Sequence, residues 1–279
     1  MPERRARTRP ARRGDLVAVD IGNSDTVVGR FHGAALDGFW RLTSGRLTAD
    51  EAALTLDLLL GHGCARGTDA TEGTRRGRAR PAAAVLCSVV PNLTLVWAEA
   101  LERVTGGPPL EVSAATAKGL LPIRYHDPTA VGADRIANAL AARALYGTPA
   151  IVVDLGTATT FDCVSREGAY LGGAIAPGVA TSAEELFRRA ARVPRVELRR
   201  PEKALGRTTE ESLRAGVLWG AAGMVDALVR RLAREMKGTP RVVATGGWAK
   251  SVAPECETVE AVDEGLTLKG MRILWEERS

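Results

Sequence analysis

The segment VAVDIGNSDT at positions 17–26 decides the fold, because its pattern returns as IVVDLGTATT at positions 151–160. Both segments have an apolar run, an Asp, an apolar residue, a Gly and then a polar residue. An apolar run that ends at a Gly turn is typical of a buried strand. Either match alone could be a chance hairpin. Two matches, with Asp20 and Asp154 134 positions apart, indicate two related α/β halves that face one another.

The rest of the pattern divides the chain into a tail and two domains. We expect a disordered basic tail at 1–14, a first domain at 15–147 and a second at 148–279. Within the first domain, residues 61–81 carry Gly, Thr and Arg without apolar periodicity, which predicts a flexible surface insertion. The domain boundary follows an Ala-rich helix predicted from Arg135 to about Leu145.

Composition indicates a globular protein whose basic character comes from its tail. The 279 residues are 45% hydrophobic and 25% charged, with 4% aromatics, so Ala, Val, Leu and Ile must build the core. Residues 1–14 hold six Arg and one Glu, a balance of +5, and the whole chain is also +5. The remainder therefore sums to zero, and we expect no nucleic-acid partner. An anionic partner for the tail is the alternative.

Targeting signals and cysteine spacing favour a cytoplasmic protein. We find no apolar signal-peptide region and no stretch that approaches the length of a membrane span, so we expect no membrane contact. Scattered cysteines without a CxxC pair indicate free thiols in a reducing compartment. The four are Cys64, Cys87, Cys163 and Cys256.

The two Asp-x-Gly turns have the chemistry of phosphate loops. Gly allows a tight turn and a close approach of backbone N–H groups to phosphate oxygens. Asp20 and Asp154 cannot bind phosphate directly, since like charges repel. They are candidates to hold Mg²⁺ or another cation, which would bridge to the phosphates. Side chains beside the glycines add donors: Asn23, Ser24, Thr26, Thr157, Thr159 and Thr160.

A third candidate element is PTAVGADR at 128–135, directly before the Ala-rich helix. A carboxylate at Asp134 could take a proton from a substrate hydroxyl as general base. Arg135 and the helix amides could bind an acidic substrate. Asp134 could equally be the helix N-cap, a common use of Asp, and spacing alone leaves both readings open.

A later helix predicted from about Glu210 to Met236 has two features. Thr208 and Glu211 fit a capping box. Gly216, Gly220 and Gly223 share one helical face, where each Gly costs about 1 kcal/mol against Ala. Close approach of another helix or subunit would explain them, and simple tolerance in a buried helix is the alternative.

Eight ordered blocks resemble the type III pantothenate kinases, a branch of the acetate and sugar kinase, Hsp70 and actin superfamily. The resemblance covers the chain from about residue 15 onward and implies two ribonuclease H-like domains, ATPase-like as in actin and Hsp70, with a nucleotide cleft between them. The blocks are DIGNSDTVVG (20–29), SVVPNLT (88–94), IRYHDPTAVGADRIANALAA (123–142), DLGTATTFD (154–162), GGAIAPG (172–178), GRTTEES (206–212), TGGWA (245–249) and LTLKGMRI (266–273).

The resemblance also implies a reaction and its residues. The reaction would be ATP-dependent phosphorylation of pantothenate to 4'-phosphopantothenate, the first step of coenzyme A biosynthesis. Asp134 would be the catalytic base, Asp154 would bind K⁺ or NH₄⁺, and Asp20 would hold Mg²⁺ through water. The family is homodimeric, with a substrate pocket completed across the dimer interface. ATP would contact Asp20, Ile21, Gly22, Asn23, Ser24, Asp25, Thr26, Val27 and Thr157. The substrate would contact Tyr125, Gly132, Ala133, Asp134, Arg135 and Thr209.

Two departures from the family pattern keep other functions open. Asp25 stands where the family usually has Asn, so a negative charge lies near the phosphates unless a cation neutralises it. His126 and Asp127 precede Pro128 where Asn is more usual, so a kinase of another small hydroxyl acceptor is one alternative. A catalytically silent regulatory homologue is another, which only the basic tail favours.

Overall fold

The computed structural model describes residues 15–62, 81–190, 193–236 and 238–279. The predicted tail at 1–14 lies outside these ranges, as do residues 63–80 of the predicted insertion at 61–81. Gly61 and His62 are the last residues of helix α1 (Ala49–His62), so that part of the insertion prediction is wrong. The helix continues by these two residues beyond its last buried side chain, Leu60.

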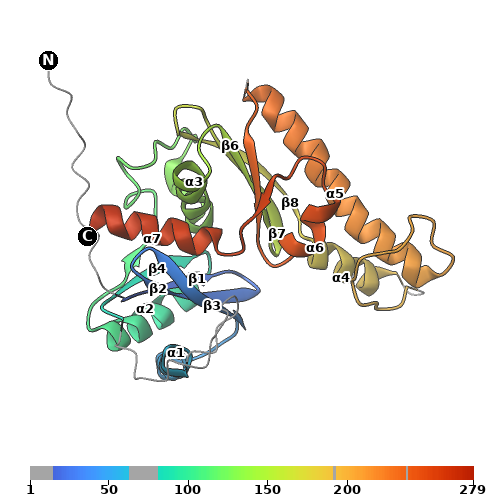
Figure 1. The fold of residues 1–279 in the computed structure, drawn as a ribbon. Helices are drawn as coiled ribbons and strands as arrows, with labels where there is room; N and C mark the ends of the chain where they lie inside the picture. The colour runs from blue at the N-terminus through green and yellow to red at the C-terminus, as the bar shows by residue number, and fades with distance from the viewer. Residues whose placement is uncertain (1–14, 63–80, 191–192, 237) are drawn as a thin grey trace, which may run out of the picture.

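Two five-stranded sheets with the same topology form the centre of the molecule (Figure 1). The first has the order β3-β2-β1-β4-β5 and the second β8-β7-β6-β9-β10. In each, the leading strand pairs antiparallel with the next strand and parallel with a later one. This duplication confirms the predicted pair of related halves. The strands are β1 (Asp15–Ile21), β2 (Asp25–His32), β3 (Ala35–Thr43), β4 (Ala83–Ser88), β5 (Leu110–Glu111), β6 (Ala150–Leu155), β7 (Ala158–Val164), β8 (Tyr170–Pro177), β9 (Arg241–Thr245) and β10 (Ala261–Val262).

Helices cover both faces of each sheet, and α3 and α7 lie in the space between the sheets (Figure 1). Besides α1, the helices are α2 (Pro91–Thr105), α3 (Ala133–Leu145), α4 (Val179–Arg189), α5 (Thr209–Glu235), α6 (Ala249–Val252) and α7 (Leu266–Arg278), with short 3-10 turns η1 (Pro128–Ala130) and η2 (Ala253–Glu255).

Strand alternation explains this layering. On β1, Val17 and Val19 face a core built with α1 and α2, whereas Leu16 and Ala18 face a core built with α3 and α7. Successive side chains of a strand point to opposite faces, so both faces of a covered sheet are apolar. On β6, Val152 belongs to the same α3–α7 core as Leu16 and Ala18.

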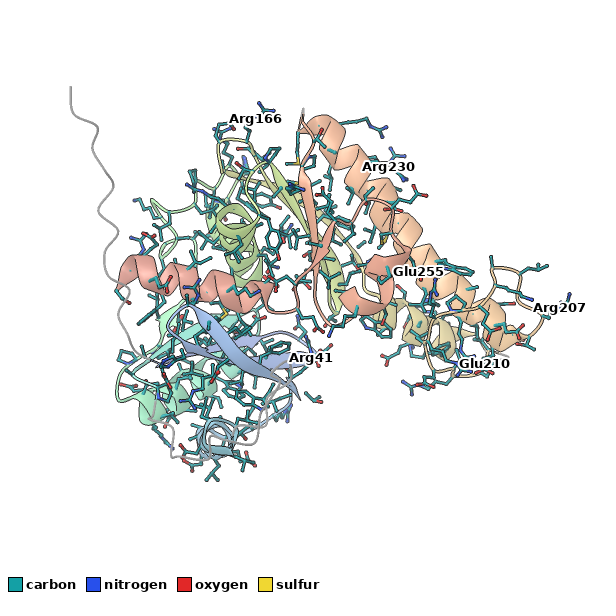
Figure 2. All side chains as sticks on the ribbon, viewed as in Figure 1. Arg41, Arg166, Arg207, Glu210, Arg230 and Glu255 are labelled. Atoms are coloured by element: carbon teal, nitrogen blue, oxygen red, sulfur yellow. The ribbon has the colours of Figure 1, made fainter. Side chains whose placement is uncertain are left out.

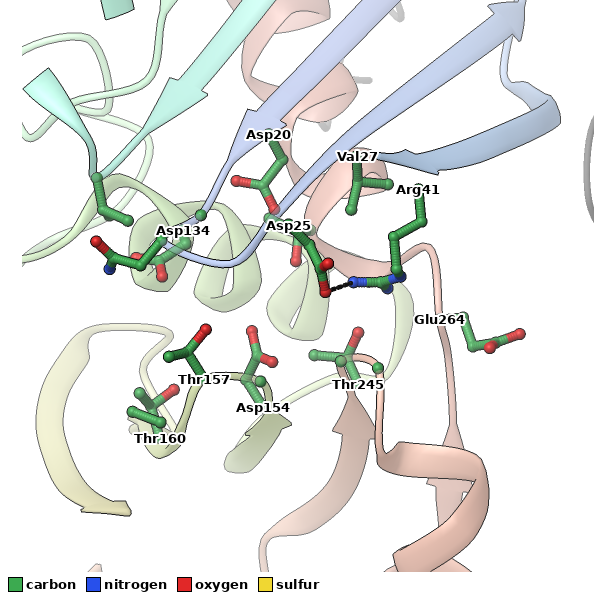
Figure 3. Close-up of a pocket in the computed structure, with 18 of the residues that line it drawn as sticks. Asp20, Asp25, Val27, Arg41, Asp134, Asp154, Thr157, Thr160, Thr245 and Glu264 are labelled. Atoms are coloured by element: carbon green, nitrogen blue, oxygen red, sulfur yellow. Dashed lines mark hydrogen bonds and ion pairs between the residues drawn. The ribbon is translucent and has the colours of Figure 1, made fainter. Parts of the chain in front are cut away.

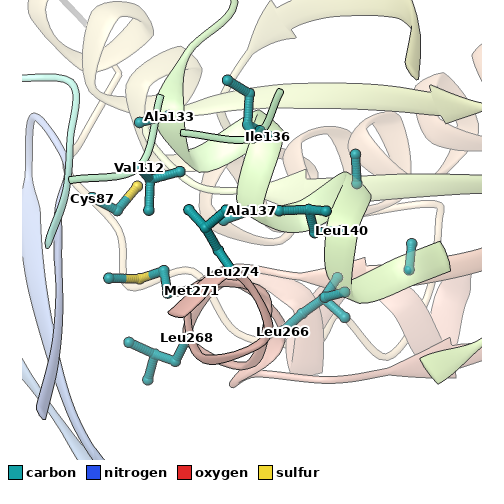
Figure 4. Close-up of a cluster of buried hydrophobic side chains, with 14 of the residues drawn as sticks. Cys87, Val112, Ala133, Ile136, Ala137, Leu140, Leu266, Leu268, Met271 and Leu274 are labelled. Atoms are coloured by element: carbon teal, nitrogen blue, oxygen red, sulfur yellow. The ribbon is translucent and has the colours of Figure 1, made fainter. Parts of the chain in front are cut away.

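Helices α3 and α7 pack against each other through buried apolar side chains (Figure 4). A Cβ atom on Gly270 would lie 1.9 Å from the carbonyl oxygen of Ala137, so Gly is required at this crossing. Helix α7 lies within the predicted second domain, yet it packs on α3, β1 and β4. The C-terminal helix therefore helps to build the core of the first half.

Helix α5 is, by length and composition alone, apolar enough to cross a membrane, which the sequence analysis did not expect. Its apolar residues Leu218, Val225 and Val229 pack into the outer core of the second sheet. Packing on the sheet is sufficient to account for its composition. The Thr208 hydroxyl accepts from the Glu211 amide, which confirms the predicted capping box.

Candidate active site

A pocket of about 170 Å³ lies where the two Asp-x-Gly turns meet (Figure 3). A second pocket of about 560 Å³ adjoins it. Both are lined by Asp25, Arg41, Gly156, Thr157, Gly247 and Glu264. Together they form a continuous cleft with walls from both halves of the chain.

The two turns are built alike and contact one another. The Gly22 amide donates to the Asp25 carbonyl at 2.9 Å, and the Gly156 amide donates to the Ala158 carbonyl at 3.0 Å. Both glycine amides therefore close their turns, and the donors left for a ligand are the following amides and the side chains. The Thr157 hydroxyl donates to the Ser24 hydroxyl at 2.8 Å, which joins the two loop tips.

Three carboxylates from three different elements line the pocket: Asp20 on β1, Asp134 on α3 and Asp154 on β6 (Figure 3). Burial, and next the negative charge of Asp134, raise the pKa of Asp20 to about 7. The same two causes raise the pKa of Asp154 to about 6. Burial also raises the pKa of Asp134, against the bond that it accepts from the Arg135 amide. Mutually repelling carboxylates in one cleft are typical of a site that takes up a cation or a proton.

Asp134 lies in the first turn of α3, but the N-cap is Gly132. The alternative prediction that Asp134 is the N-cap is therefore wrong, because the helix begins at Ala133 and its N-cap is Gly132. Its Oδ1 accepts from the Arg135 amide at 2.8 Å. A Cβ atom on Gly132 would lie 2.5 Å from this Oδ1, so the glycine makes room for the carboxylate.

Asp25 has a cationic partner within the chain. Its carboxylate pairs with Arg41 of β3 at 3.0 Å, at the boundary of the two pockets (Figure 3). Both side chains are partly exposed, so the pair is accessible to a ligand. Arg41, which the sequence analysis did not identify, is thus a cation that offsets the charge of Asp25.

Asp154 is held by a hydrogen-bonded chain across three elements. The buried Asn138 of α3 donates to Asp154 Oδ2 at 3.1 Å, and the Thr267 hydroxyl of α7 donates to Asn138 Oδ1 at 2.8 Å. The Thr267 bond requires the Asn138 amide group to face Asp154. The other oxygen of Asp154 lies toward Gly246, where a Cβ atom would approach it to 2.5 Å.

Arg135 is paired with an acid that the sequence analysis did not single out. Its Nε donates to Oδ1 of Asp162, a fully buried residue of β7, at 2.6 Å. The Tyr170 hydroxyl donates to the same oxygen at 3.0 Å. The two groups form a buried ion pair. Burial raises the pKa of Asp162 to about 7, although the charge of Arg135 opposes that rise.

Some predicted site residues lie outside the pocket lining. Ile21 and Thr26 are buried, and the Thr26 hydroxyl is bonded to Ser44, so only their backbone groups could contact a nucleotide. Tyr125 is 40% exposed beside Gly172 and Tyr170. Predicted residues that line the first pocket are Asp20, Gly22, Asn23, Asp25, Val27, Asp134, Asp154 and Thr157; Ser24 lines the second, and Gly132, Ala133 and Arg135 line neither.

Thr209 is separated from the other predicted substrate residues. It lines an apolar groove of about 570 Å³ between α4 and α5, together with Gly216 and Gly220. Its neighbours Arg207 and Glu210 lie far from Arg41, at the outer end of α5 (Figure 2). A single chain therefore does not bring Thr209 to Asp134.

Several pocket-lining residues carried no role in the sequence analysis. Thr245, Gly246 and Gly247 belong to the TGGWA block, whose order was recognised without a function. Arg41, Glu264 and Thr267 have no local motif, because their relation to the site depends on tertiary packing.

The residues fit a cation held jointly with a ligand better than a closed metal cage. Within the described ranges, no group of three or more His, Cys, Asp or Glu side chains is arranged to chelate an ion. Mg²⁺ in phosphate-transfer sites is commonly held by one or two carboxylates, waters and phosphate oxygens. The carboxylates of Asp20 and Asp154 are the hard oxygen donors that such an ion needs.

The chain is similar in sequence to a family model and to proteins of the same name from several bacteria. The family model described as type III pantothenate kinase matches residues 16–231. The chain is 45% identical to the type III pantothenate kinase of Moorella thermoacetica over 262 residues, covering 94% of this chain and 98% of that one. It is 44% identical to the enzyme of the same name from Geobacter sulfurreducens and 43% identical to that from Thermobifida fusca, with the same coverages.

Solved structures support the fold. A conserved Baf family protein from Campylobacter jejuni superposes with a TM-score of 0.56 at 22% identity, covering 94% of this chain and 98% of that one. The activator of 2-hydroxyisocaproyl-CoA dehydratase from Clostridium difficile, solved with bound ADPNP, has a TM-score of 0.53 at 14% identity and covers 95% of each chain. At these identities the likeness concerns the fold alone.

Proposed function

The chain belongs to the type III pantothenate kinase family, and we propose on that premise that it transfers the γ-phosphoryl group of ATP to the primary hydroxyl of pantothenate. This is the first step of coenzyme A biosynthesis. The observation that carries the proposal beyond the family match is the convergence of Asp20, Asp134 and Asp154 on one cleft between two joined phosphate-loop turns.

In the proposed mechanism the pantothenate hydroxyl oxygen attacks the γ-phosphorus, and the bond from that phosphorus to the bridging oxygen breaks, releasing ADP. Asp134 accepts the hydroxyl proton and passes it to solvent. A raised pKa makes this carboxylate a stronger base than an exposed Asp. Backbone amides and hydroxyls of the two turns would orient the phosphates, so that positioning supplies much of the rate.

We propose that Asp20 holds Mg²⁺ through water and that Asp154 holds K⁺ or NH₄⁺. Bound cations would neutralise the charge that develops on the phosphate oxygens. The raised pKa values of both residues support these assignments, because a bound cation would relieve the repulsion that raises them.

We also propose a cytoplasmic homodimer in which Thr209 completes the substrate pocket of the partner. Thr209 lies on an apolar groove, whereas its predicted role requires it near an acceptor. Gly216 and Gly220 on that groove have nothing within 4 Å of an added Cβ atom, so a second chain could approach closely.

Two observations weigh against the alternatives. Asp127, which departs from the family pattern, accepts from the Thr129 amide at 2.9 Å and from its hydroxyl at 2.7 Å, so it has a local role as the cap of η1. This removes much of the reason to expect another acceptor. The silent homologue would have no use for three mutually repelling carboxylates in one cleft.

The test is ADP release with ATP, Mg²⁺ and K⁺, with and without pantothenate. We expect pantothenate-dependent turnover that falls when Na⁺ replaces K⁺. Asp134→Asn should bind ATP and lose turnover, while Asp57→Asn, an exposed change on α1, should match the wild type. ADP release that pantothenate does not stimulate, in a protein that binds ATP, would contradict the proposal.

A further inference from the structure

Asp162 is the most completely enclosed acid near the candidate acceptor site. Its side chain has no exposed surface, and it lies on β7 across from the first turn of α3. Oδ1 accepts two bonds, from Arg135 Nε at 2.6 Å and from the Tyr170 hydroxyl at 3.0 Å. Burying a carboxylate is costly even when it is paired, so its presence calls for a reason beyond filling space.

The bonds of Arg135 divide its guanidinium into a fixed edge and a free end. Nε is bonded to Asp162, and Nη2 donates to the Phe161 carbonyl at 3.3 Å. Within the described parts of the chain, Nη1 has no hydrogen-bond partner. The guanidinium is planar and rigid, so fixing the Nε edge also fixes the direction of Nη1.

The same cluster extends to a second predicted substrate residue. The guanidinium carbon of Arg135 lies 5.8 Å from the centre of the Tyr170 ring, and the Tyr170 and Tyr125 rings are 6.3 Å apart at 51°. Tyr125 is exposed at 40%, and Gly172 leaves room for its ring. Asp162 therefore anchors, through Arg135 and Tyr170, a row of groups that leads from the core to the surface.

We propose that Asp162 is a positioning residue for the acceptor: it clamps the Nε edge of Arg135 so that only the Nη1 end can bind the carboxylate of the acceptor substrate. This inference rests on the proposed function, since it assumes an acceptor that carries a carboxylate. The geometry excludes side-on binding through Nε and Nη2, because Asp162 and the Phe161 carbonyl occupy that edge. The carboxylate of the acceptor must therefore bind at the Nη1 end of the guanidinium.

The clamp can be tested by a graded series at position 162. Asp162→Asn keeps an oxygen that can accept from Arg135 Nε but loses the charge, and Asp162→Ala loses both. We expect KM for pantothenate to rise about 10-fold in the first and about 100-fold in the second, because a misplaced guanidinium loses a charge-assisted bond. KM for ATP should change less than about 2-fold in both. Asp226→Asn, a change of a buried acid in the α5 region, is the matched control and should leave both KM values unchanged.

Two results would overturn the clamp. If Asp162 only dampened the charge of Arg135, the unpaired Arg135 would attract the carboxylate more strongly and KM for pantothenate would fall in Asp162→Asn. If Asp162 only supported the fold, both variants would lose active protein with both KM values unchanged.

A spectroscopic measurement separates this inference from the proposed function. In ¹⁵N-labelled protein, an Nε–H group bonded to a buried carboxylate should give a downfield, slowly exchanging proton signal, assigned by its loss in Arg135→Lys. We expect the signal in the wild type, with or without pantothenate, and its loss in Asp162→Ala. Wild-type protein that shows the signal but does not turn over pantothenate would refute the proposed acceptor, and absence of the signal would refute the clamp.

Discussion

Replacing Asp20 by Asn should stabilise the ligand-free protein while it abolishes turnover. Burial and the nearby charge of Asp134 raise the pKa of Asp20 from 3.8 to about 7. A carboxylate whose pKa is raised by folding destabilises the folded state at every pH at which it is ionised. At about 1.4 kcal/mol for each tenfold change in an equilibrium constant, this rise destabilises the folded state at pH 8 by at most about 4 kcal/mol.

Two effects reduce the gain that the substitution should recover. The half-buried Asp20 side chain lines a pocket that is open to solvent, and solvent there screens its charge. Asn also brings an NH₂ group that needs a partner, and an unpaired buried donor costs about 1–3 kcal/mol. We therefore expect a net gain of about 2 kcal/mol at pH 8, or about 4–8 °C in the melting temperature of a chain of this size.

The stability difference between Asp20→Asn and the wild type should depend on pH. Between about pH 4 and pH 7 the folded wild type holds a proton that the unfolded chain releases, so its stability rises as the pH falls. The advantage of Asp20→Asn should be full at pH 8, shrink through pH 6 and reverse near pH 4, where the wild type has lost its buried charge and only the cost of the added NH₂ group remains. Melting curves of both proteins, without nucleotide or divalent cations, at pH 8, 6 and 4.5 test this.

The control is Asp226→Asn, for which the opposite sign is expected. Burial alone would raise the pKa of Asp226, but bonds from the Glu257 amide and from the amide and hydroxyl of Thr258 outweigh it and lower the pKa. The free energy of unfolding of this variant should be lower by about 1–3 kcal/mol at pH 8. The ionised, hydrogen-bonded carboxylate stabilises the fold at pH values above its pKa, and the substitution removes it. A stability gain in Asp20→Asn that stays constant with pH, or a loss at pH 8, would refute the electrostatic reasoning.

Three further changes test other parts of the site. Asp25→Asn frees Arg41 for the phosphates and removes a negative charge, so KM for ATP should fall about 3- to 10-fold; a rise in steady-state assays would show that the pair itself supports the nucleotide. Asn138→Ala removes the bond to Asp154 and should raise the K⁺ concentration for half-maximal thermal stabilisation about 10-fold, and an unchanged value would place the cation elsewhere. Gly220→Glu puts a charge in the α4–α5 groove and should convert a dimer into 29.5 kDa monomers in light scattering, unless the interface lies on another face.

Local sequence signals were sufficient for most of the fold. The repeated strand–Asp–Gly pattern predicted two related halves, because apolar runs and Gly turns depend on neighbouring residues alone. Capping residues placed a helix start equally well: Thr208 and Glu211 are bonded as the capping pattern predicted. The start of α3 was misjudged by two residues, since Gly132 caps the helix through its backbone alone and carries no side-chain signal.

The partners of the site residues were beyond the reach of sequence patterns. Arg41 is 16 positions from Asp25, and Asp162 is 27 positions from Arg135, so neither pair has a spacing rule. These contacts exist because β3 lies beside β2 and because α3 crosses β7. Thr209 presents a further difficulty, since its predicted role needs a second chain.

The phosphate and acceptor parts of the site should respond independently to substitution. Asp25 and Arg41 come from the first sheet, whereas Asp162 lies on the second and Arg135 on α3, and the two pairs share no hydrogen bond. The free-energy effects of two substitutions that share no interaction partner usually add to within about 0.5 kcal/mol. The double variant Asp25→Asn/Asp162→Asn should therefore show the KM for ATP of the first change and the KM for pantothenate of the second, each within about 2-fold. A larger deviation would indicate that the two substrates are coupled, for example through Asp134, whose charge acts on both Asp20 and Asp162.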